Sequence, residues 1–284
     1  MHSKQLKYIQ RLIFILFFAI SVLLATVLAP GSQGVGIYFF DIGQGDSSMI
    51  VLPDNLQVII DGGPGDSVVE KLGSYVPFYD RTIEYMILTH AHSDHLNGLV
   101  DVAKRYSIST FIYNGINEGA ENLINELQKQ DTRIIKITEK KSIYLSDNVQ
   151  FEILFPDHIL TPIEYKDPND SSLIGRLVYN DTAVLFTGDA PQAVEAYLVN
   201  TGALISADII NIGHHGSKTS TDPRFIEIVD PLFGIISVGE NNYGHPDART
   251  LSTLRRGLVE VLRTDEEGDI HFISNGIELV RTAP

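Results

Sequence analysis

The sequence predicts an α/β fold in which two β-sheets are each covered by helices. From residue 35 onward, short runs rich in Val, Ile, Phe and Tyr alternate with amphipathic stretches of helical length. Several apolar runs are nearly continuous, and such strands need cover on both faces. The 284-residue chain is 44% apolar and 20% charged, which is enough for one large core. Residues 35–284 show no internal boundary and are predicted to form one domain.

The predicted strands are short apolar runs bounded by turn-forming residues. They lie at residues 35–42, 56–61, 85–90, 110–114, 133–137, 149–155, 173–179, 182–189, 207–213, 232–239 and 269–274. Helices are predicted at residues 66–75, 96–106, 118–129, 191–200, 222–229 and 247–261. Asn180 and Asp181 separate two strands at hairpin spacing, so residues 173–189 are expected to form a β-hairpin.

The first 34 residues differ from the rest of the chain. Residues 12–29 are apolar except for Ser21 and Thr26, and a helix of this length spans about 27 Å. Basic residues precede this run, so we expect one N-terminal hydrophobic helix that acts as a signal anchor, with the body outside the cytoplasm. A cleaved signal peptide, which would give a secreted protein, is the alternative. Residues 30–34 are predicted to be a linker.

Charge and cysteine content exclude several classes of function. The chain has a net charge of −15 and no cysteine, which excludes thiolate catalysis, cysteine-type zinc sites and disulfide bonds. Three of the 21 basic residues precede the apolar run, so 18 basic residues face 36 acidic ones in the remainder. Such an acidic body is poorly suited to gripping a nucleic-acid backbone over a long track. Any chemistry on nucleic acid would therefore have to be local.

Three of the nine histidines fall within six residues, in the stretch THAHSDHLNG at 89–98. His90 and His92 are two residues apart on extended backbone and therefore project to the same side. Asp94 and His95 follow at the turn into the next helix, where they can face an adjacent point. Imidazole and carboxylate groups are good ligands for Zn²⁺ or Mn²⁺, and a divalent cation relieves the repulsion between crowded histidines. The stretch therefore predicts a metal site.

The motifs along the chain resemble those of a known family. They are FFDIGQGDSSMI at 39–50, VIIDGG at 58–63, THAHSDHLNG at 89–98, NDSSLIGRLVY at 169–179, LFTGD at 185–189, NIGHHGSKTS at 211–220 and SVGENNYGHP at 237–246. In this order they are similar to the nuclease-like C-terminal domain of ComEC-type competence proteins. The resemblance covers about residues 36–280 and implies the metallo-β-lactamase fold, a four-layer αββα sandwich with a metal site along one edge. Full-length proteins of this type carry a many-helix membrane channel, whereas this chain has a single apolar segment.

The resemblance also implies two divalent metal ions, Zn²⁺ or Mn²⁺, and a set of ligands. The implied ligands are His90, His92, Asp94, His95, Asp189, His214, His215 and His245. Asp189 is expected to bridge the two ions, and a helix N-cap before Pro191 is the alternative. The sequence does not decide which of His214 and His215 binds metal. The other would position substrate, protonate a leaving group or lie in the core. The catalytic residues are expected to be Asp94, Asp189, His214 and His215.

Further polar residues are expected to bind substrate or to orient the ligands. They are Asp46, Asp61, Asn169, Asp170, Ser217, Lys218 and Asn242. Asp61 is predicted to accept a hydrogen bond from a ligand histidine, whereas Asp46 has turn formation as its alternative. Lys218 is predicted to hold a phosphate oxygen, while Ser220 is a candidate cap for the helix near Asp222. The histidines outside these motifs, His2, His158 and His271, are predicted to lie on the surface.

The implied activity is metal-dependent hydrolysis, most simply of a phosphodiester such as DNA. Two dications lower the pKa of a shared water, which yields a hydroxide nucleophile near neutral pH. Fold and metal do not fix the substrate, so a small-substrate hydrolase such as a phosphocholine esterase or a lactone or lactam hydrolase is one alternative. A non-enzymatic accessory domain for DNA uptake is the other. The expected partners are a phosphodiester substrate and, through residues 12–29, a membrane; no partner protein can be inferred.

Overall fold

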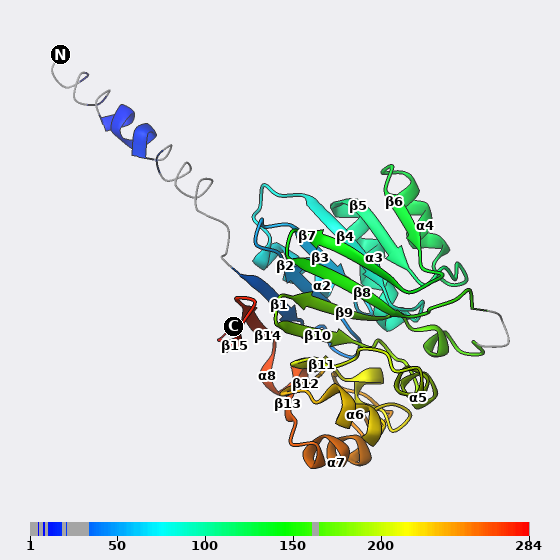
Figure 1. Ribbon diagram of the computed structural model, residues 1–284. Helices are drawn as coiled ribbons and strands as arrows, with labels where there is room; N and C mark the ends of the chain where they lie inside the picture. The colour runs from blue at the N-terminus through cyan, green and yellow to red at the C-terminus, as the bar shows by residue number, and fades with distance from the viewer. Residues whose placement is uncertain are drawn as a thin grey trace.

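The computed structural model describes most of the chain, namely Gln5, Tyr8, residues 11–18, Ser21, residues 34–160 and residues 165–283. Within this part, two β-sheets pack face to face, and helices cover their outer surfaces (Figure 1). The predicted α/β architecture of two covered sheets is confirmed.

The first sheet consists of β1 (Val35–Phe39), β2 (Ser48–Val51), β3 (Gln57–Ile60), β4 (Thr82–Leu88), β5 (Ser107–Tyr113), β6 (Arg133–Lys136), β14 (Ile270–Ser274) and β15 (Leu279–Thr282). Its strand order is β15-β14-β1-β2-β3-β4-β5-β6. The second sheet consists of β7 (Lys141–Ser146), β8 (Val149–Phe155), β9 (Ile174–Tyr179), β10 (Thr182–Phe186), β11 (Ile209–Asn211), β12 (Phe233–Ile236) and β13 (Glu260–Arg263). Its strand order is β13-β12-β11-β10-β9-β8-β7.

The helices divide between the two outer faces. The first sheet is covered by α2 (Ser67–Tyr75), α3 (Ser93–Arg105) and α4 (Glu121–Gln128), and the second by α5 (Gln192–Asn200), α6 (Pro223–Val229) and α7 (Ala248–Arg256). Short elements complete the fold: α8 (Thr264–Glu267) and the 3₁₀-helices η1 (Pro168–Ser171) and η2 (Gly213–Gly216). Apolar side chains fill three layers, one between the sheets and one under each set of helices. Central strands are therefore buried on both faces, which explains their continuous apolar runs.

Strand direction brings distant motifs to one edge of the sandwich. β3 runs parallel to β4, and β10 runs parallel to β11. The carboxyl ends of β3 and β4 lead to Asp61 and His90, and those of β10 and β11 lead to Asp189 and His214. We call this side of the molecule, where these four residues lie, the carboxyl edge.

The first turn of α3 is held against the loop that follows β3. The Gly62 N–H donates to the His95 carbonyl oxygen at 2.7 Å, and the Gly98 N–H donates to the Gly63 carbonyl oxygen at 3.0 Å. A Cβ on Gly98 would lie only 1.8 Å from the Gly62 carbonyl oxygen, so no larger residue fits without displacing the helix. This backbone contact fixes the position of His95 relative to β3.

Several boundaries differ from the prediction. The strands β2, β7, β13 and β15 and the short α8 were not expected from the sequence. Gly257 ends α7, and residues 260–263 pair in parallel with β12, so the predicted helix at 247–261 is wrong over its last turn. α3 begins at Ser93 and not after His95. β7 and β15 are edge strands whose place is set by pairing with a neighbour, which a short mixed sequence does not reveal.

The predicted hairpin over residues 173–189 is confirmed at its centre. β9 and β10 pair antiparallel, with Tyr179 opposite Thr182. Asn180 at the turn has a positive φ of 52°, a conformation that asparagine tolerates better than most residues.

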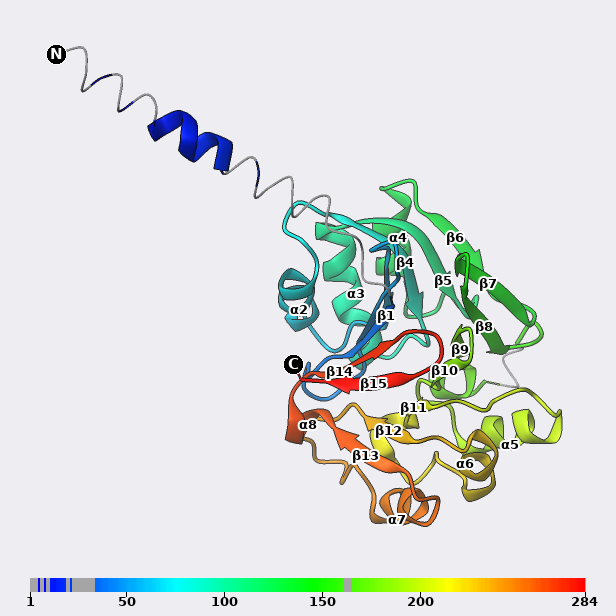
Figure 2. The same ribbon diagram turned by 60° about the vertical axis from the view of Figure 1, so that its left-hand side comes forward.

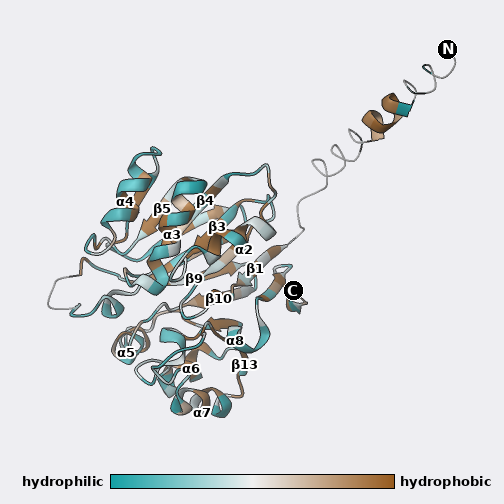
Figure 3. Cartoon of the chain, turned by 180° about the vertical axis from the view of Figure 1, so that it is seen from behind, coloured by the Kyte–Doolittle hydropathy of each residue, from teal (hydrophilic) through white to brown (hydrophobic). Residues whose placement is uncertain are grey.

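The predicted N-terminal hydrophobic helix lies mostly outside the described residues. Residues 11–18 are helical, largely apolar and exposed, and they project away from the body (Figure 3). Among the residues with a described structure, none belongs to a helix that is both long and apolar enough to cross a bilayer. The signal anchor and the signal peptide therefore both stay predictions.

The glycine contact under α3 gives a test of this packing. We expect Gly98→Ala to lower the free energy of unfolding by at least about 2 kcal/mol, because the added methyl group forces backbone apart. Gly73→Ala is the matched control, since a Cβ at Gly73 in α2 meets no atom within 4 Å. The control should be neutral or stabilise by about 0.5–1 kcal/mol. Urea unfolding followed by circular dichroism measures both, and equal stabilities would contradict this account.

Candidate metal centre

Four histidines surround one buried carboxylate at the carboxyl edge. Asp189 follows β10, and its Oδ1 lies 3.2 Å from His95 Nε2 and 3.8 Å from His215 Nε2. Its Oδ2 lies 3.8 Å from His90 Nε2 and 3.7 Å from His214 Nε2. The two oxygens of this carboxylate therefore face two different pairs of imidazoles.

His92 lies beside His90, on the Oδ2 side of Asp189. His90 Nε2 and His92 Nδ1 lie 3.2 Å apart, and His90, His92 and Asp189 form a first group of donors within 4.8 Å of one another. Two ligands at about 2.0–2.1 Å from a tetrahedral ion lie roughly 3.4 Å from each other. The spacing of the two nitrogens therefore suits a single shared ion.

Asp94, in the first turn of α3, lies beside His95 and His215 on the Oδ1 side of Asp189. Asp94 Oδ2 lies 3.3 Å from His215 Nε2, and Asp94, His95 and His215 form a second group of donors within 4.8 Å. This group meets Asp189 through Oδ1, whereas the first group meets it through Oδ2. The arrangement provides two adjacent sets of donors with one carboxylate between them.

The buried atoms of the centre fit a divalent cation. His95 Nε2, His215 Nε2 and Asp189 Oδ1 are buried and have no hydrogen-bond partner among the described residues. Leaving such atoms unpaired costs roughly 1–3 kcal/mol each, and imidazole and carboxylate donors are those that Zn²⁺ and Mn²⁺ accept. The side chains of His92, Asp94 and His214 are 36%, 30% and 27% exposed, so the centre opens to solvent on one side.

The charges of the centre also favour a cation. Burial opposes a charge on His215, but neighbouring carboxylates, Asp189 foremost, raise its pKa to about 10. Burial likewise opposes ionisation of Asp189, yet the facing imidazoles, His95 foremost, hold its pKa well below the usual range. Burial and the nearby His95 lower the pKa of His90 well below its ordinary value. A divalent cation would replace imidazole protons as the counter-charge to the carboxylates, so its binding is expected to release protons.

A buried carboxylate behind the centre fixes the orientation of His95. His95 Nδ1 donates to Asp61 Oδ2 at 2.8 Å, which leaves Nε2 directed at Asp189. Thr89 donates its backbone N–H to Asp61 Oδ1 at 2.8 Å and its hydroxyl to Oδ2 at 2.6 Å. Hydrogen bonds of this kind set the tautomer of a metal-binding imidazole. Thr89 was not singled out from the sequence, although it directly precedes His90.

A second carboxylate stands behind His215. Its Nδ1 lies 2.9 Å from the Ser237 carbonyl oxygen and 3.3 Å from Asp46 Oδ1. Asn211 Nδ2 donates to the other oxygen of Asp46 at 2.8 Å. Asp46 therefore contacts the centre instead of its own turn. Asn211 and Ser237 were not expected here. Each lies at or just beyond the carboxyl end of a strand, and no neighbouring residue in the sequence marks it as part of a site.

The adjacent histidines of η2 adopt an uncommon backbone. His214 and His215 have φ values of 53° and 52°, in the left-handed region. For residues other than glycine, this conformation costs about 1–2 kcal/mol each. It brings the two neighbouring rings to different oxygens of Asp189. The structure thus places both histidines at the centre, where the sequence left the choice open.

His245 lies beside the two donor groups and belongs to neither. Its ring centroid is 5.4 Å from that of His214, and its Nδ1 is buried without a hydrogen-bond partner among the described residues. The loop that presents it is organised by Asn241, which donates to the His245 carbonyl oxygen and accepts from the His245 N–H. Asn242, the residue predicted to contact substrate, is exposed to solvent.

The loop of residues 165–171 flanks the centre on the side of His92. Asp170 accepts hydrogen bonds from the backbone N–H groups of Lys166 and Asp167 and so closes the first turn of η1. Asn169 Oδ1 is buried and has no hydrogen-bond partner within the described part of the chain. Asp167, which was not predicted, places Oδ1 at 3.8 Å from His92 Nε2.

The loop after His215 flanks the centre on the other side. Ser217 Oγ lies 3.0 Å from Thr219 Oγ1, which in turn lies 3.1 Å from His214 Nδ1. The Lys218 side chain is exposed at the rim of this loop.

Two helix-cap alternatives from the sequence are wrong. The Ser220 hydroxyl donates to the Ala190 carbonyl oxygen, and α6 is capped by Asp222. Asp189 does not cap α5, whose N-cap residue is Pro191 and carries no side-chain cap.

The surface prediction for unmatched histidines holds for one of three. His158 is exposed. His271 is buried, where its Nε2 lies 2.9 Å from the Tyr75 hydroxyl, so the surface prediction is wrong for this residue. β14 turns that side chain toward α2. His2 lies outside the described residues.

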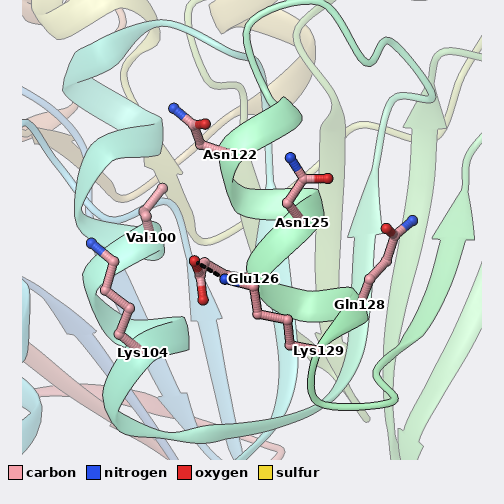
Figure 4. A pocket seen from close by; sticks show the side chains of 7 residues that line it. All are labelled: Val100, Lys104, Asn122, Asn125, Glu126, Gln128 and Lys129. Atoms are coloured by element: carbon pink, nitrogen blue, oxygen red, sulfur yellow. Dashed lines mark hydrogen bonds and ion pairs between the residues drawn. The ribbon is translucent and has the colours of Figure 1, made fainter.

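One hollow on the described surface lies apart from this centre. It lies between α3 and α4, measures about 690 Å³ and is lined by Val100, Lys104, Asn122, Asn125, Glu126, Gln128 and Lys129 (Figure 4). None of the predicted site residues lines it. Its lysines are engaged with acidic neighbours, as in the contact of 2.6 Å between Lys129 and Glu126.

The fold and the donor geometry agree with a sequence match. The profile of the metallo-beta-lactamase superfamily matches residues 41–240, more than half of the chain. The chain belongs to the metallo-β-lactamase superfamily. Divalent metal binding is the property that this superfamily implies, and the His/Asp groups around Asp189 are the residues available for it.

Comparisons with individual proteins found relatives in sequence and a neighbour in structure. ComE operon protein 3 of Bacillus subtilis is 31% identical over 255 residues, which cover 82% of this chain and 32% of that protein. Exodeoxyribonuclease YycJ of Bacillus anthracis is 24% identical over 117 residues, 41% of this chain and 40% of that one. The structure of the metallo-beta-lactamase fold protein YhfI from Bacillus subtilis superposes with a TM-score of 0.52 and 12% identity, covering 80% of this chain and 95% of that chain.

These relatives confirm the predicted resemblance to ComEC-type competence proteins. The chain spans about a third of the length of these competence relatives. The structural likeness, at 12% identity, supports the fold alone.

The hydrogen bond behind His95 provides a test of the centre. In Asp61→Asn, an amide N–H₂ would face His95 Nδ1 or the Thr89 hydroxyl, which disfavours the tautomer that leaves Nε2 free. We expect the affinity for Zn²⁺ or Mn²⁺ to fall about 10- to 100-fold. Asp101→Asn, which removes a surface contact to Lys104 on the same region of the fold, should leave the affinity unchanged. Competition with a chromophoric chelator measures both, and equal affinities would show that Asp61 does not orient a ligand.

Proposed function

We propose that this chain is a metal-dependent phosphodiesterase that uses two divalent ions and acts on nucleic-acid strands. The observation that carries the proposal is the shared carboxylate: one oxygen of Asp189 faces His95 and His215, and the other faces His90 and His214. Two adjacent sites about 3.5–4 Å apart are the arrangement that stabilises both the attacking and the leaving oxygen of a phosphodiester.

The identity of the relatives supports this substrate class. Competence proteins and an exodeoxyribonuclease are among the proteins that the chain resembles in sequence. The acidic body, with a net charge of −15, argues for contact with a short stretch of nucleic acid and not with a long track. We infer that the protein acts at the cell membrane or outside the cytoplasm, as residues 12–29 predict.

Each of the two donor groups would hold one ion. His90, His92 and His214 would hold one ion, and Asp94, His95 and His215 would hold the other. When bound, the ions supply an activated water nucleophile and neutralise the charge that develops on the phosphate.

The residues around the centre would position the substrate. Lys218, exposed beside His214, would bind a non-bridging phosphate oxygen through its ammonium group, with the Ser217 hydroxyl next to it. His245 lies outside both donor groups with a buried, unpaired Nδ1, so we propose that it contacts the substrate. Its Nδ1 could donate to or accept from an oxygen of the substrate.

A pocket beside His92 has room for one substituent of the phosphate. It measures about 340 Å³ and is lined by Ala91, Asn114, Ile116, Glu118, Gly119, Tyr165, Lys166, Asp167, Pro168 and Ser171. Asp167 links it to the centre through the 3.8 Å approach to His92. The ring of Tyr165 and the apolar wall formed by Ile116 suit a planar base.

A second candidate function is suggested by the charge of the same pocket. Glu118 and Asp167 outnumber Lys166 there, and together with the Tyr165 ring they would suit a cationic group such as choline. A phosphocholine esterase is therefore the alternative. Parallel assays on a single-stranded oligonucleotide and on p-nitrophenylphosphorylcholine distinguish the two, because each candidate turns over one of them preferentially.

The residue roles are tested by steady-state kinetics on a chromogenic diester with Mn²⁺ or Zn²⁺ in excess. We expect Asp189→Asn and His92→Ala to abolish measurable turnover, because each removes a donor that the ions share or require. Lys218→Ala should raise KM about tenfold and lower kcat little, since it loses one charge-assisted hydrogen bond to substrate. Lys104→Ala, in the groove between α3 and α4, is the control and should match the unaltered chain (Figure 4).

Two results would contradict these assignments. Unaltered turnover in Asp189→Asn would show that the shared carboxylate is not needed. A collapse of kcat in Lys218→Ala, with KM unchanged, would place that lysine at the reacting atoms and not at a remote phosphate oxygen.

A further inference from the structure

The side of the molecule opposite the metal centre is formed by the amino ends of parallel strands. β1 is antiparallel to β2, and β2 is antiparallel to β3, so β1, β3 and β4 all run in the same direction. Their amino ends therefore lie together, at the end of the sheet farthest from Asp61 and His90. We call this side, marked by Val35, Gln57 and Thr82, the amino edge.

The second sheet shares this edge. The Asp181 N–H, in the turn between β9 and β10, donates to the Gly276 carbonyl oxygen at 2.8 Å. Next to it, Thr182 Oγ1 and Ser274 Oγ lie 2.6 Å apart, and Ser274 pairs with Val35 at the start of β1. β10 thus begins at the amino edge and ends toward Asp189, as β4 begins there and ends toward the histidines.

Exposed apolar side chains lie at this edge, on both sides of the point where β1 begins. On the loop before β4, Phe78 is 81% and Tyr79 is 58% exposed, and their rings stack edge to face. On the hairpin of β14 and β15, Ile277 at the turn is 75% exposed, and the cross-strand partners Ile273 and Val280 are 46% and 54% exposed. Figure 2 shows this hairpin beside β1.

The apolar groups lie on two separate turns of the first sheet. β14 and β4 are separated by four steps in the sheet, which is about 19 Å at 4.8 Å per step, with β1 between them. A Cβ on Gly34, the residue before β1, would lie 3.5 Å from Ile273 Cγ2, so the chain enters the body directly over this apolar hairpin.

The chain that enters there is itself strongly apolar. Only five residues, 30–34, separate β1 from the run of apolar residues at 12–29. The described part of that run, residues 12–18, is helical and has side chains that are 50–70% exposed, with no cover from the body. A short linker joins this exposed apolar helix to the exposed apolar edge. Both can leave water by contacting the same apolar surface.

We propose that the amino edge rests on the surface of a lipid bilayer, with residues 12–29 in the bilayer and Phe78, Tyr79 and Ile277 at the interface. Tyr79, an aromatic side chain with one polar end, favours this depth, and the apolar Phe78 and Ile277 beside it gain from leaving water. Asp54, Asp80, Asp181 and Glu278 lie in the turns of this edge, and Arg81, Arg105 and Arg133 lie at the amino ends of β4, β5 and β6. Acidic and basic residues nearly balance, so the edge suits a zwitterionic surface and is not expected to gain from anionic lipid.

This docking fixes the direction in which the metal centre faces. The seven residues of β4 separate the two edges by about 20 Å, so the centre opens into solvent above the bilayer and away from lipid headgroups. Its substrate would approach from the aqueous side. The proposal concerns the orientation of the body and does not depend on which ester the centre hydrolyses.

Single tryptophan reporters test the proposal, because the chain contains no tryptophan. The full chain is reconstituted in phosphatidylcholine vesicles with and without brominated acyl chains. Phe17→Trp reports insertion of the N-terminal segment, Phe78→Trp and Ile277→Trp report the amino edge, and Tyr243→Trp, 76% exposed beside His245, reports the opposite edge. We expect a blue shift and at least twofold quenching for the first three and no change for Tyr243→Trp. Replacing part of the lipid by phosphatidylserine should not strengthen the quenching.

Each other outcome overturns the proposal. Quenching of Phe17→Trp alone would show a tethered body that does not dock, and quenching of Tyr243→Trp would show the reverse orientation. A chain that stays in the aqueous fraction excludes a bilayer altogether. A blue shift without vesicles, together with a dimer in sedimentation, would assign the edge to a second copy. Diesterase assays on the same variants are independent, since quenching without turnover would contradict only the proposed function.

Discussion

The structure depends on one buried carboxylate that faces four imidazoles. Asp189 is 2% exposed, and each of its oxygens lies 3.2–3.8 Å from two histidine nitrogens. A buried ionised group without full compensation is expensive, and the atoms left unpaired around Asp189 are also buried. Divalent cations between these donors would satisfy both the charge and the unpaired atoms. The surrounding fold can be understood as the means of holding the donors in place against their mutual repulsion.

Three features of the fold hold them. Parallel strands of both sheets end at the same edge, so donors that are far apart in the sequence meet there. The glycine contact between Gly98 and Gly62 places α3 against β3, and Asp61 and Thr89 then fix the ring of His95. The left-handed backbone of η2 directs two neighbouring rings to different oxygens of Asp189. Strain of this kind persists only where the surroundings determine it, and it is common at functional sites.

The donors could be found from the sequence because their spacing is local. Three histidines within six residues, and two adjacent ones after an apolar strand, are visible without any knowledge of the fold. Asn211 and Asp167 could not be found in this way, since each contacts the centre through tertiary structure alone. Thr89 adjoins His90, but its role depends on a hydrogen bond to Asp61, which lies 28 residues earlier. The same reason explains the missed edge strands β7 and β15, which owe their conformation to a pairing partner. The burial of His271 against Tyr75 likewise follows from the packing of α2 and not from any motif.

The most direct test of the central claim is a crystal structure of the chain soaked in Mn²⁺, with anomalous difference maps recorded at long wavelength. We expect two anomalous peaks about 3.5–4 Å apart, with one oxygen of Asp189 bound to each ion. The peak nearer His90 and His92 should also contact His214, and the peak nearer Asp94 and His95 should also contact His215. A single peak at saturating Mn²⁺ would contradict the presence of two ions. Two peaks that are not joined by the Asp189 carboxylate would contradict its role as the shared ligand.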